Sequence, residues 1–173
     1  MKRFELLVLL ALLLANCSGK SDVQLFQEGT AAEESGNFQV AADRYEEVVK
    51  RFQSSAYAES ALYRAGLVYN NDMHDPAKAV GAYRRFYEFF PSSKQAPTAL
   101  FLSGFLLNNE LHQTDSAKLA YEMFLKNYPK HDLAASAKFE LETLGKDPGP
   151  LLKIDTAADN RSRTHPPPQA SSQ

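Results

Sequence analysis

The chain has 173 residues, of which 44% are hydrophobic and 23% are charged, which is enough to bury one sizeable core. The 19 basic and 21 acidic side chains give a formal charge of -2, so no overall basic field attracts nucleic acid, and none is expected as a partner. The single cysteine, Cys17, excludes an intramolecular disulfide framework and a cysteine-based zinc site.

The first segment has the pattern of a secretory signal peptide. Two basic residues follow Met1, and an unbroken apolar run occupies 6–15. A helix of that length reaches about 15 Å, roughly half of a bilayer's hydrocarbon core, so it is too short to span a membrane. The alternative, a buried core helix, would seldom begin so close to a basic N-terminus. We therefore expect residues 1–16 to be a signal peptide that is removed.

The residues that end the apolar run resemble a lipobox. The sequence Leu14-Ala15-Asn16-Cys17 is similar to the motif of bacterial lipoproteins, in which the cysteine is lipidated and becomes the new N-terminus. The resemblance implies lipidation of Cys17 and a short anchored linker at 17–21. Ser18 follows, where an aspartate would imply inner-membrane retention, and this favours the outer membrane. The alternative is a free cysteine.

The middle of the chain, residues 22–145, repeats with a period of 38 residues. Small residues and aromatic rings recur in register at Ala41, Ala79 and Ala117 and at Tyr45, Tyr83 and Tyr121. The same period relates Val48, Phe86 and Phe124; Phe52, Phe90 and Tyr128; Pro91 and Pro129; Gly66 and Gly104; and Ala61, Ala99 and Ala137. A fixed period over this length is typical of stacked supersecondary units.

The spacing inside each unit is helical. In the first unit the apolar positions i, i+4, i+7 and i+11, which share one helix face, are Ala41, Tyr45, Val48 and Phe52. A second apolar helix precedes each such stripe, for example at 61–69 and 99–107. Three hairpins and a closing helix at about 132–144 predict seven helices in an all-α fold.

Turn residues mark several helix ends. Asp75-Pro76 predicts an N-cap followed by proline at the first helical position. Pro91 and Pro129 end the helices before them, and Ser92-Ser93 can cap the next helix.

These landmarks resemble the tetratricopeptide repeat. The family's small residue, alanine, aromatic residue and proline are present as Gly66, Ala79, Tyr83 and Pro91 and again as Gly104, Ala117, Tyr121 and Pro129. The resemblance implies a right-handed superhelix of three helical hairpins and a capping helix over 22–145. Of the four residues by which this period exceeds the family's, one is expected in the turn around His74 or His112. Glu28 stands where the first repeat should have glycine and Gln53 where it should have proline, so the first unit is expected to be atypical.

A finer resemblance is to envelope lipoproteins. The spacing Pro-x-Ser-x-x-Ala-x-x-Ala is present as Pro91, Ser93, Ala96 and Ala99. It is similar to the tetratricopeptide variant in outer-membrane lipoproteins of the BamD type, and to the C-terminal domain of the Tol–Pal coordinator CpoB (YbgF).

The last segment, 146–173, differs in composition from the rest. It has no aromatic residue, and it includes the proline run 166–168. Such a segment cannot bury enough apolar surface to offset the entropy of ordering, so we expect a disordered tail. A spacer is favoured over a polyproline docking motif.

The sequence gives little sign of catalysis. His74 and His112 occupy equivalent turns, but a metal site would need a third ligand, so they are interpreted as polar turn residues. No nucleophile motif or phosphate-binding glycine loop is present. Paired acids such as Glu46-Glu47 have the pattern of a solvated helix face. We therefore expect no enzyme activity, no cofactor and no metal.

The binding surface expected from the family is the concave face formed by the first helix of each hairpin. Gly66 and Gly104 align the two repeats with the family pattern. In that alignment the residues expected to face the groove are Tyr63, Leu67, Asn70 and Asn71 in one repeat and Phe101, Phe105, Asn108 and Asn109 in the next. Amides can bond a peptide backbone while the rings hold its side chains. The alternative is that the apolar residues are ordinary inter-repeat core and the asparagines only loosen helix ends. The alternative binding surface is the convex side around Tyr87 and Phe89.

Together these features predict a non-enzymatic scaffold, anchored by lipid at Cys17 to the periplasmic face of the bacterial outer membrane. Its partner would be an envelope protein or peptide segment, and outer-membrane protein assembly is the favoured process. The alternative is a Tol–Pal or peptidoglycan-synthesis coordinator, or a pilotin-like carrier of a secretion subunit.

Overall fold

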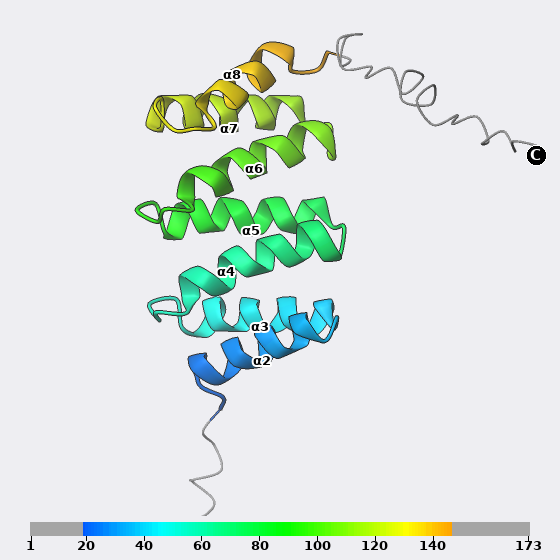
Figure 1. The fold of residues 1–173 in the computed structure, drawn as a ribbon, viewed down its shortest axis with the longest axis vertical. Coiled ribbons are helices and arrows are strands. Elements are labelled where there is room, and N and C mark those ends of the chain that lie inside the picture. The colour runs from blue at the N-terminus through cyan, green and yellow to red at the C-terminus, as the bar shows by residue number, and fades with distance from the viewer. Residues whose placement is uncertain (1–18, 147–173) are drawn as a thin grey trace, which may run out of the picture.

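The computed structural model describes residues 19–146, and this part of the chain contains helices and no strand. The helices are α2 (Asp22–Glu34), α3 (Phe38–Arg51), α4 (Ala58–Leu67), the π-helix η1 (Val68–Asp72), α5 (Pro76–Phe89), α6 (Ala96–Asn109), α7 (Thr114–Asn127) and α8 (Ala134–Thr143). Each α-helix packs against the next, and together they form a single column (Figure 1). The predicted leader, Cys17 and the tail from 147 onward lie outside the described residues.

The predicted all-α hairpin arrangement is confirmed. The pairs α2–α3, α4–α5 and α6–α7 are the three hairpins, and α8 is the closing helix, with bounds slightly inside the expected 132–144. The right-handed sense of the superhelix stays a prediction.

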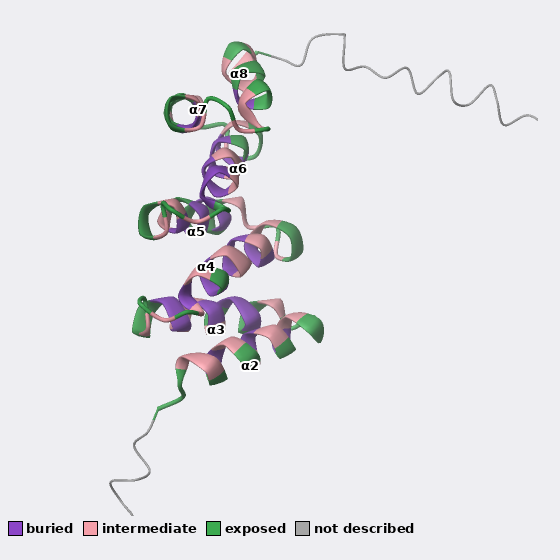
Figure 2. Cartoon of the chain, turned by 60° about the vertical axis from the view of Figure 1, so that its left-hand side comes forward, coloured by how far each residue is buried: buried purple, intermediate pink, exposed green. Residues whose placement is uncertain are grey.

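The buried seam between successive helices follows the sequence period (Figure 2). Tyr45, Tyr83 and Tyr121 are fully buried on the second helix of each hairpin. The alanines that lie four residues before them are also fully buried, as are Ala61, Ala99 and Ala137 on the first helices. Small residues on one helix therefore accommodate rings from the next, and this interdigitation gives the core its regular spacing.

The glycine register corrects one expectation. A Cβ atom at Gly66 would lie 2.6 Å from Cε1 of Tyr83 and would clash with the ring, and one at Gly104 would lie 3.0 Å from Cε1 of Tyr121, so that ring would have to shift. Gly29 has the same relation to Tyr45, at 2.7 Å, whereas Glu28 is solvent-facing. The first repeat therefore does have its glycine, and the expectation based on Glu28 was wrong. The chain from Gly29 to Tyr45 is one residue shorter than the chain from Gly66 to Tyr83 or from Gly104 to Tyr121, which breaks the period by one.

The later turns contain the extra residue. After α4 the chain continues as the π-helix η1, which takes one more residue per turn than an α-helix. His74 and His112 then adopt positive φ angles of 51° and 53°, where the first repeat has Gly36 at 77°. Histidine tolerates this left-handed conformation better than most residues. Both histidines therefore reverse the chain between the two helices of a hairpin.

One capping prediction is confirmed and one is wrong. The Asp75 side chain accepts a hydrogen bond from the backbone N–H of Lys78, with Pro76 at the first helical position of α5. Ser93 does not cap α6, which begins after Gln95. Its hydroxyl instead accepts from the backbone N–H of Gln95 at 3.1 Å and donates to Glu59 on α4 at 2.7 Å. The serine therefore links the turn to the preceding repeat.

Candidate functional site

The predicted concave residues lie on the first helices of the second and third hairpins. The rings of Tyr63 and Phe101 are half-buried against the second helix of their own hairpin. The Tyr63 ring centroid lies 5.2 Å from that of Phe86, and the Phe101 centroid lies 6.0 Å from that of Phe124. Burial raises the pKa of Tyr63. Part of each ring therefore belongs to the hairpin core, and only the remaining edge is available to a partner.

Leu67 and the free edge of Tyr63 line a shallow groove of about 340 Å³ on α4. We call this the α4 groove; its other lining residues are Glu33, Glu59, Ser60, Arg64, Phe86 and Gln95. The groove therefore spans from α2 across α4 to the turn before α6. Its rim contains an ion pair, with Nη1 of Arg64 lying 2.8 Å from Oε2 of Glu33. An apolar centre with a charged rim is a suitable contact area for a peptide.

The third hairpin offers a different surface. Phe105 stacks on Phe101 with 6.4 Å between the ring centroids, and 37% of Phe105 remains exposed. The amide of Asn109 donates to the backbone carbonyl of Phe105 at 3.0 Å, and that of Asn108 donates to Glu140 on α8 at 3.4 Å. The amides of this repeat are therefore engaged within the chain.

The two asparagine pairs are not equivalent in structure. Asn70 and Asn71 lie in the π-helix, and the amide of the first donates to the side-chain oxygen of the second at 2.8 Å. Asn108 and Asn109 lie in a regular α-helix. The two amide pairs therefore differ in their geometry. A role of these eight residues in binding stays a prediction.

The tyrosines beneath this surface differ in their hydrogen bonds. The Tyr45 hydroxyl donates to Glu33 at 2.6 Å, and the Tyr121 hydroxyl donates to Glu140 at 3.4 Å. The Tyr83 hydroxyl is buried and has no partner among the described residues. Its hairpin has Asn70 in the register of Glu33, and that amide faces Asn71 instead. Burial raises the pKa of Tyr83 well above the ordinary tyrosine value.

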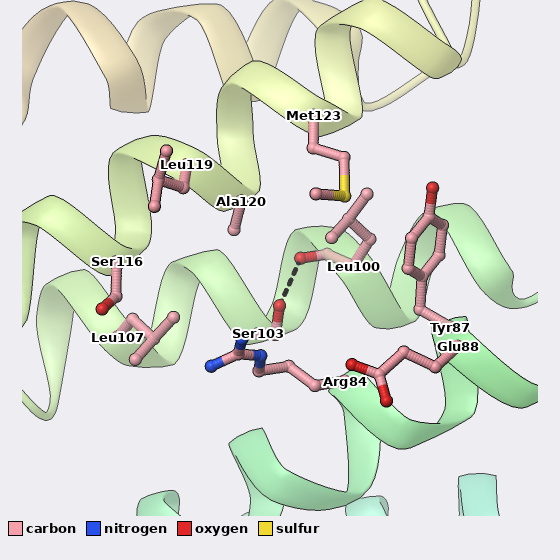
Figure 3. Close-up of a pocket in the computed structure, with 10 residues that line it drawn as sticks. All are labelled: Arg84, Tyr87, Glu88, Leu100, Ser103, Leu107, Ser116, Leu119, Ala120 and Met123. Atoms are coloured by element: carbon pink, nitrogen blue, oxygen red, sulfur yellow. Dashed lines mark hydrogen bonds between the residues drawn. The ribbon is translucent and has the colours of Figure 1, made fainter.

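The opposite side of the column has a more enclosed cavity of about 260 Å³, which we call the α5–α7 groove (Figure 3). Helix α6 forms its floor with Leu100 and Leu107, while α7 contributes Leu119, Ala120 and Met123. Leu119 is 64% exposed and Met123 is 44% exposed, so the apolar wall is open to solvent. This groove was not predicted from the sequence.

The polar rim of the α5–α7 groove comes mainly from α5. Arg84 extends along the groove toward Leu107, and Tyr87 lies at the other end (Figure 3). The Tyr87 hydroxyl accepts a hydrogen bond from the amide of Asn127 at 2.7 Å. On the floor, the hydroxyl of Ser103 is buried and donates to the carbonyl of Leu100 at 2.8 Å. Tyr87 is the one groove residue that the sequence marked on the convex side.

Both grooves lie in a part of the chain without a candidate metal site. Among residues 19–146, no three side chains of histidine, cysteine, aspartate or glutamate are grouped so that they could hold a metal ion. Over the same range no helix has the length and apolarity needed to cross a membrane. What both grooves offer is apolar area bordered by charge, which is the chemistry of protein contact.

The comparison with known families covers every described helix. Residues 18–146 match the family model YfiO, described as an outer membrane lipoprotein. The match begins directly after Cys17, the residue predicted to bear the lipid. No curated protein matches the chain. Because the match spans most of the sequence, the chain belongs to the YfiO family, the BamD-like tetratricopeptide lipoproteins of the outer membrane.

Proposed function

We propose that this lipoprotein is a non-enzymatic scaffold that holds a peptide or domain of the machinery for outer-membrane protein assembly. The family supports an interaction scaffold at the periplasmic face of the outer membrane. The observation that carries the proposal is the α4 groove, because it joins α2, α4 and the turn before α6 in one continuous contact area. An extended segment lying there would touch consecutive repeats.

The chemistry of the α4 groove defines the contact. Leu67 and the edge of Tyr63 would hold an apolar side chain of the partner. The ion pair of Arg64 and Glu33 would lie beside the partner's backbone. Phe105, in the next repeat, would extend the apolar strip because its ring is partly exposed. Lipidation at Cys17 would keep the scaffold at the membrane where assembly occurs.

The test is site-specific photo-crosslinking in intact cells. A photoreactive residue is placed at position 67 or 105, on the concave face formed by the first helices of the hairpins. As the control, it is placed at position 40 on α3. Val40 is 47% exposed, so the probe there is at least as accessible as at positions 67 and 105. We expect positions 67 and 105 to crosslink to a component of outer-membrane protein assembly, identified by mass spectrometry, and position 40 not to do so.

Two results would contradict the proposal. Crosslinks that form only from position 40 would remove the concave surface from consideration. Crosslinks from positions 67 and 105 to a Tol–Pal, peptidoglycan-synthesis or secretion component would keep the surface but replace the process. Leu67→Gln replaces an apolar side chain of the groove by a polar one of similar size, outside the buried seam. It should reduce the adduct at position 105 while leaving the melting temperature nearly unchanged.

A further inference from the structure

The α5–α7 groove differs from the corresponding interval one repeat earlier. Between α3 and α5 the gap is bridged by an ion pair between Arg85 and Glu46. One period later, Arg84 stands at the position of Glu46 and Met123 at the position of Arg85. No ion pair can form between those two, so the second interval lacks the charged bridge that joins α3 and α5 in the first.

A second, independent observation is that Arg84 has no carboxylate partner among the described residues. The other arginines in the described part, Arg44, Arg51, Arg64 and Arg85, each have a carboxylate within 4.0 Å. Arg84 has none in that part of the chain, although it lines the groove. Its guanidinium is an exposed donor of several hydrogen bonds in a fixed plane, and its preferred partner is a carboxylate.

The apolar wall has the spacing of a helix-binding surface. Leu119 and Met123 are four residues apart on one face of α7, and both are exposed over the floor of α6. At the position of Leu119 the preceding repeat has Gly81, so that interval has no such wall. An amphipathic helix presents apolar anchors at i, i+4 and i+7, and these match a trough between two helices.

We propose that the α5–α7 groove is a second docking site, which binds an acidic amphipathic helix of a partner protein. Apolar side chains of the partner helix cover Leu119 and Met123, and one carboxylate of the partner helix pairs with Arg84. The site is separate from the α4 groove and does not depend on the proposed function, since it lies on the opposite side of the column.

The charges at the rim also fix the direction of the bound helix. Glu88 lines the groove on the same helix as Arg84, one turn further toward Tyr87. A carboxylate of the partner is attracted to the end near Arg84 and repelled at the end near Glu88. The acidic end of the bound helix therefore lies over Ser116 and Leu107, because that is the end toward which the Arg84 guanidinium extends.

The probe is a synthetic, fluorescently labelled amphipathic helix with leucines at i, i+4 and i+7 and glutamates on the flanking positions. It is titrated into the purified full chain at low salt, and binding is followed by fluorescence anisotropy. The same peptide with lysines replacing the glutamates is the charge control. We expect the acidic peptide to bind about tenfold or more tightly than the basic one.

Variants of the protein separate the groove from nonspecific attraction. Leu119→Asp should weaken the acidic peptide about tenfold or more, because it places a like charge in the apolar wall. Val40→Asp is the matched control, since it makes the same change at an exposed apolar residue on α3. Arg84→Glu should reverse the preference in favour of the basic peptide. Leu67→Gln, in the α4 groove, should leave binding unchanged.

Methionine methyl groups report the location directly. The sequence has three methionines: Met123 lies in the groove, Met73 lies in the turn before α5, and Met1 belongs to the predicted leader. With carbon-13 methyl labels, the acidic peptide should shift the Met123 signal and leave the Met73 signal in place.

The proposal is overturned if the acidic peptide fails to bind the folded wild-type chain. Equal binding to the Leu119→Asp and Val40→Asp variants would also overturn it, as would a shift of Met73 without Met123. Loss of binding in the Leu67→Gln variant alone would move the contact to the α4 groove and remove this second site. Because this assay uses a defined peptide, its outcome is independent of the crosslinking in cells.

Discussion

At the scale of single residues, the hydroxyl of Tyr83 is the clearest local defect. Tyr45 and Tyr83 are both fully buried, and both lie against the glycine of the preceding helix. Only Tyr45 has a hydrogen-bond acceptor, Glu33. A buried polar group without a partner costs about 1–3 kcal/mol, whereas a satisfied one contributes about 1 kcal/mol.

We therefore expect opposite effects from one chemical change. Tyr83→Phe should raise the free energy of unfolding by about 1 kcal/mol, because it removes an unsatisfied hydroxyl. Tyr45→Phe should lower it by about 1–2 kcal/mol, because Glu33 loses the hydroxyl that donates to it. Urea denaturation followed by circular dichroism measures both. A lower stability for both variants would mean that the Tyr83 hydroxyl is satisfied in solution.

Tyr83→Phe should also change how the stability of the protein depends on pH in the alkaline range. Burial raises the pKa of Tyr83, while in the unfolded chain a tyrosine ionises near about pH 10. Above that pH the unfolded chain releases a proton that the folded chain keeps, so stability falls as the pH rises. Burial also raises the pKa of Tyr69, to about 12, so this residue contributes to the same loss. Tyr83→Phe should reduce the slope of melting temperature against pH above about pH 10.

The residue scale also shows where sequence reasoning fails. The period placed Ala41 and Tyr45 correctly, because an insertion outside a helix leaves the spacing inside it intact. It misplaced the first glycine, because the chain from Gly29 to Tyr45 is one residue shorter than that from Gly66 to Tyr83, and a strict period arrives at Glu28 in place of Gly29. The close contact between glycine and tyrosine identifies the register better than the period does.

At the scale of elements, α8 is the most informative helix. Its Phe139 is in register with Phe101, which packs against Tyr121 and Phe124 of the following helix. No described helix follows α8, and Phe139 is 55% exposed. The same ring at the same position therefore has two different environments, which a pattern of apolar residues alone does not distinguish.

This contrast predicts unequal costs of truncation. Phe101→Ala should lower the free energy of unfolding by about 2 kcal/mol, since a half-buried ring loses its contacts with three others. Phe139→Ala should change it by less than about 0.5 kcal/mol, as expected of a surface substitution. Thermal and urea denaturation of the two variants measure the difference. Equal costs would show that Phe139 is covered in the native protein.

At the scale of the whole molecule, the fold was predictable and the α5–α7 groove was not. Each hairpin buries an apolar stripe that the sequence shows directly, so helices and stacking follow from spacing. The α5–α7 groove reflects a difference between two repeats: an ion pair of Arg85 and Glu46 bridges one interval, whereas Arg84 and Met123 occupy the equivalent positions in the other and cannot pair. The repeat was identified from positions at which the repeats share a residue type. The groove depends on solvent-facing positions at which they differ, so the shared pattern does not indicate it.

The whole molecule also has a predicted orientation at the membrane. A lipid on Cys17 would precede α2 by only a short linker, since α2 begins at Asp22. A linker of that length reaches at most about 18 Å when extended, so the first hairpin would stay close to the bilayer, whereas α8 lies at the opposite end of the column (Figure 1). The last hairpins, which form the α5–α7 groove, would then face the periplasm.

Cys17→Ser tests this arrangement. Two or more acyl chains anchor a protein stably, because each buried methylene contributes about 0.8 kcal/mol. The variant should therefore move from the membrane fraction to the soluble fraction, and mass spectrometry should show acyl chains on the wild-type chain only. Its melting temperature should equal that of the wild type, because the first described helix begins after the linker. A wild-type chain without lipid would disprove the anchor, and membrane retention of the variant would mean that a protein partner, engaged through one of the two grooves, holds the scaffold in place.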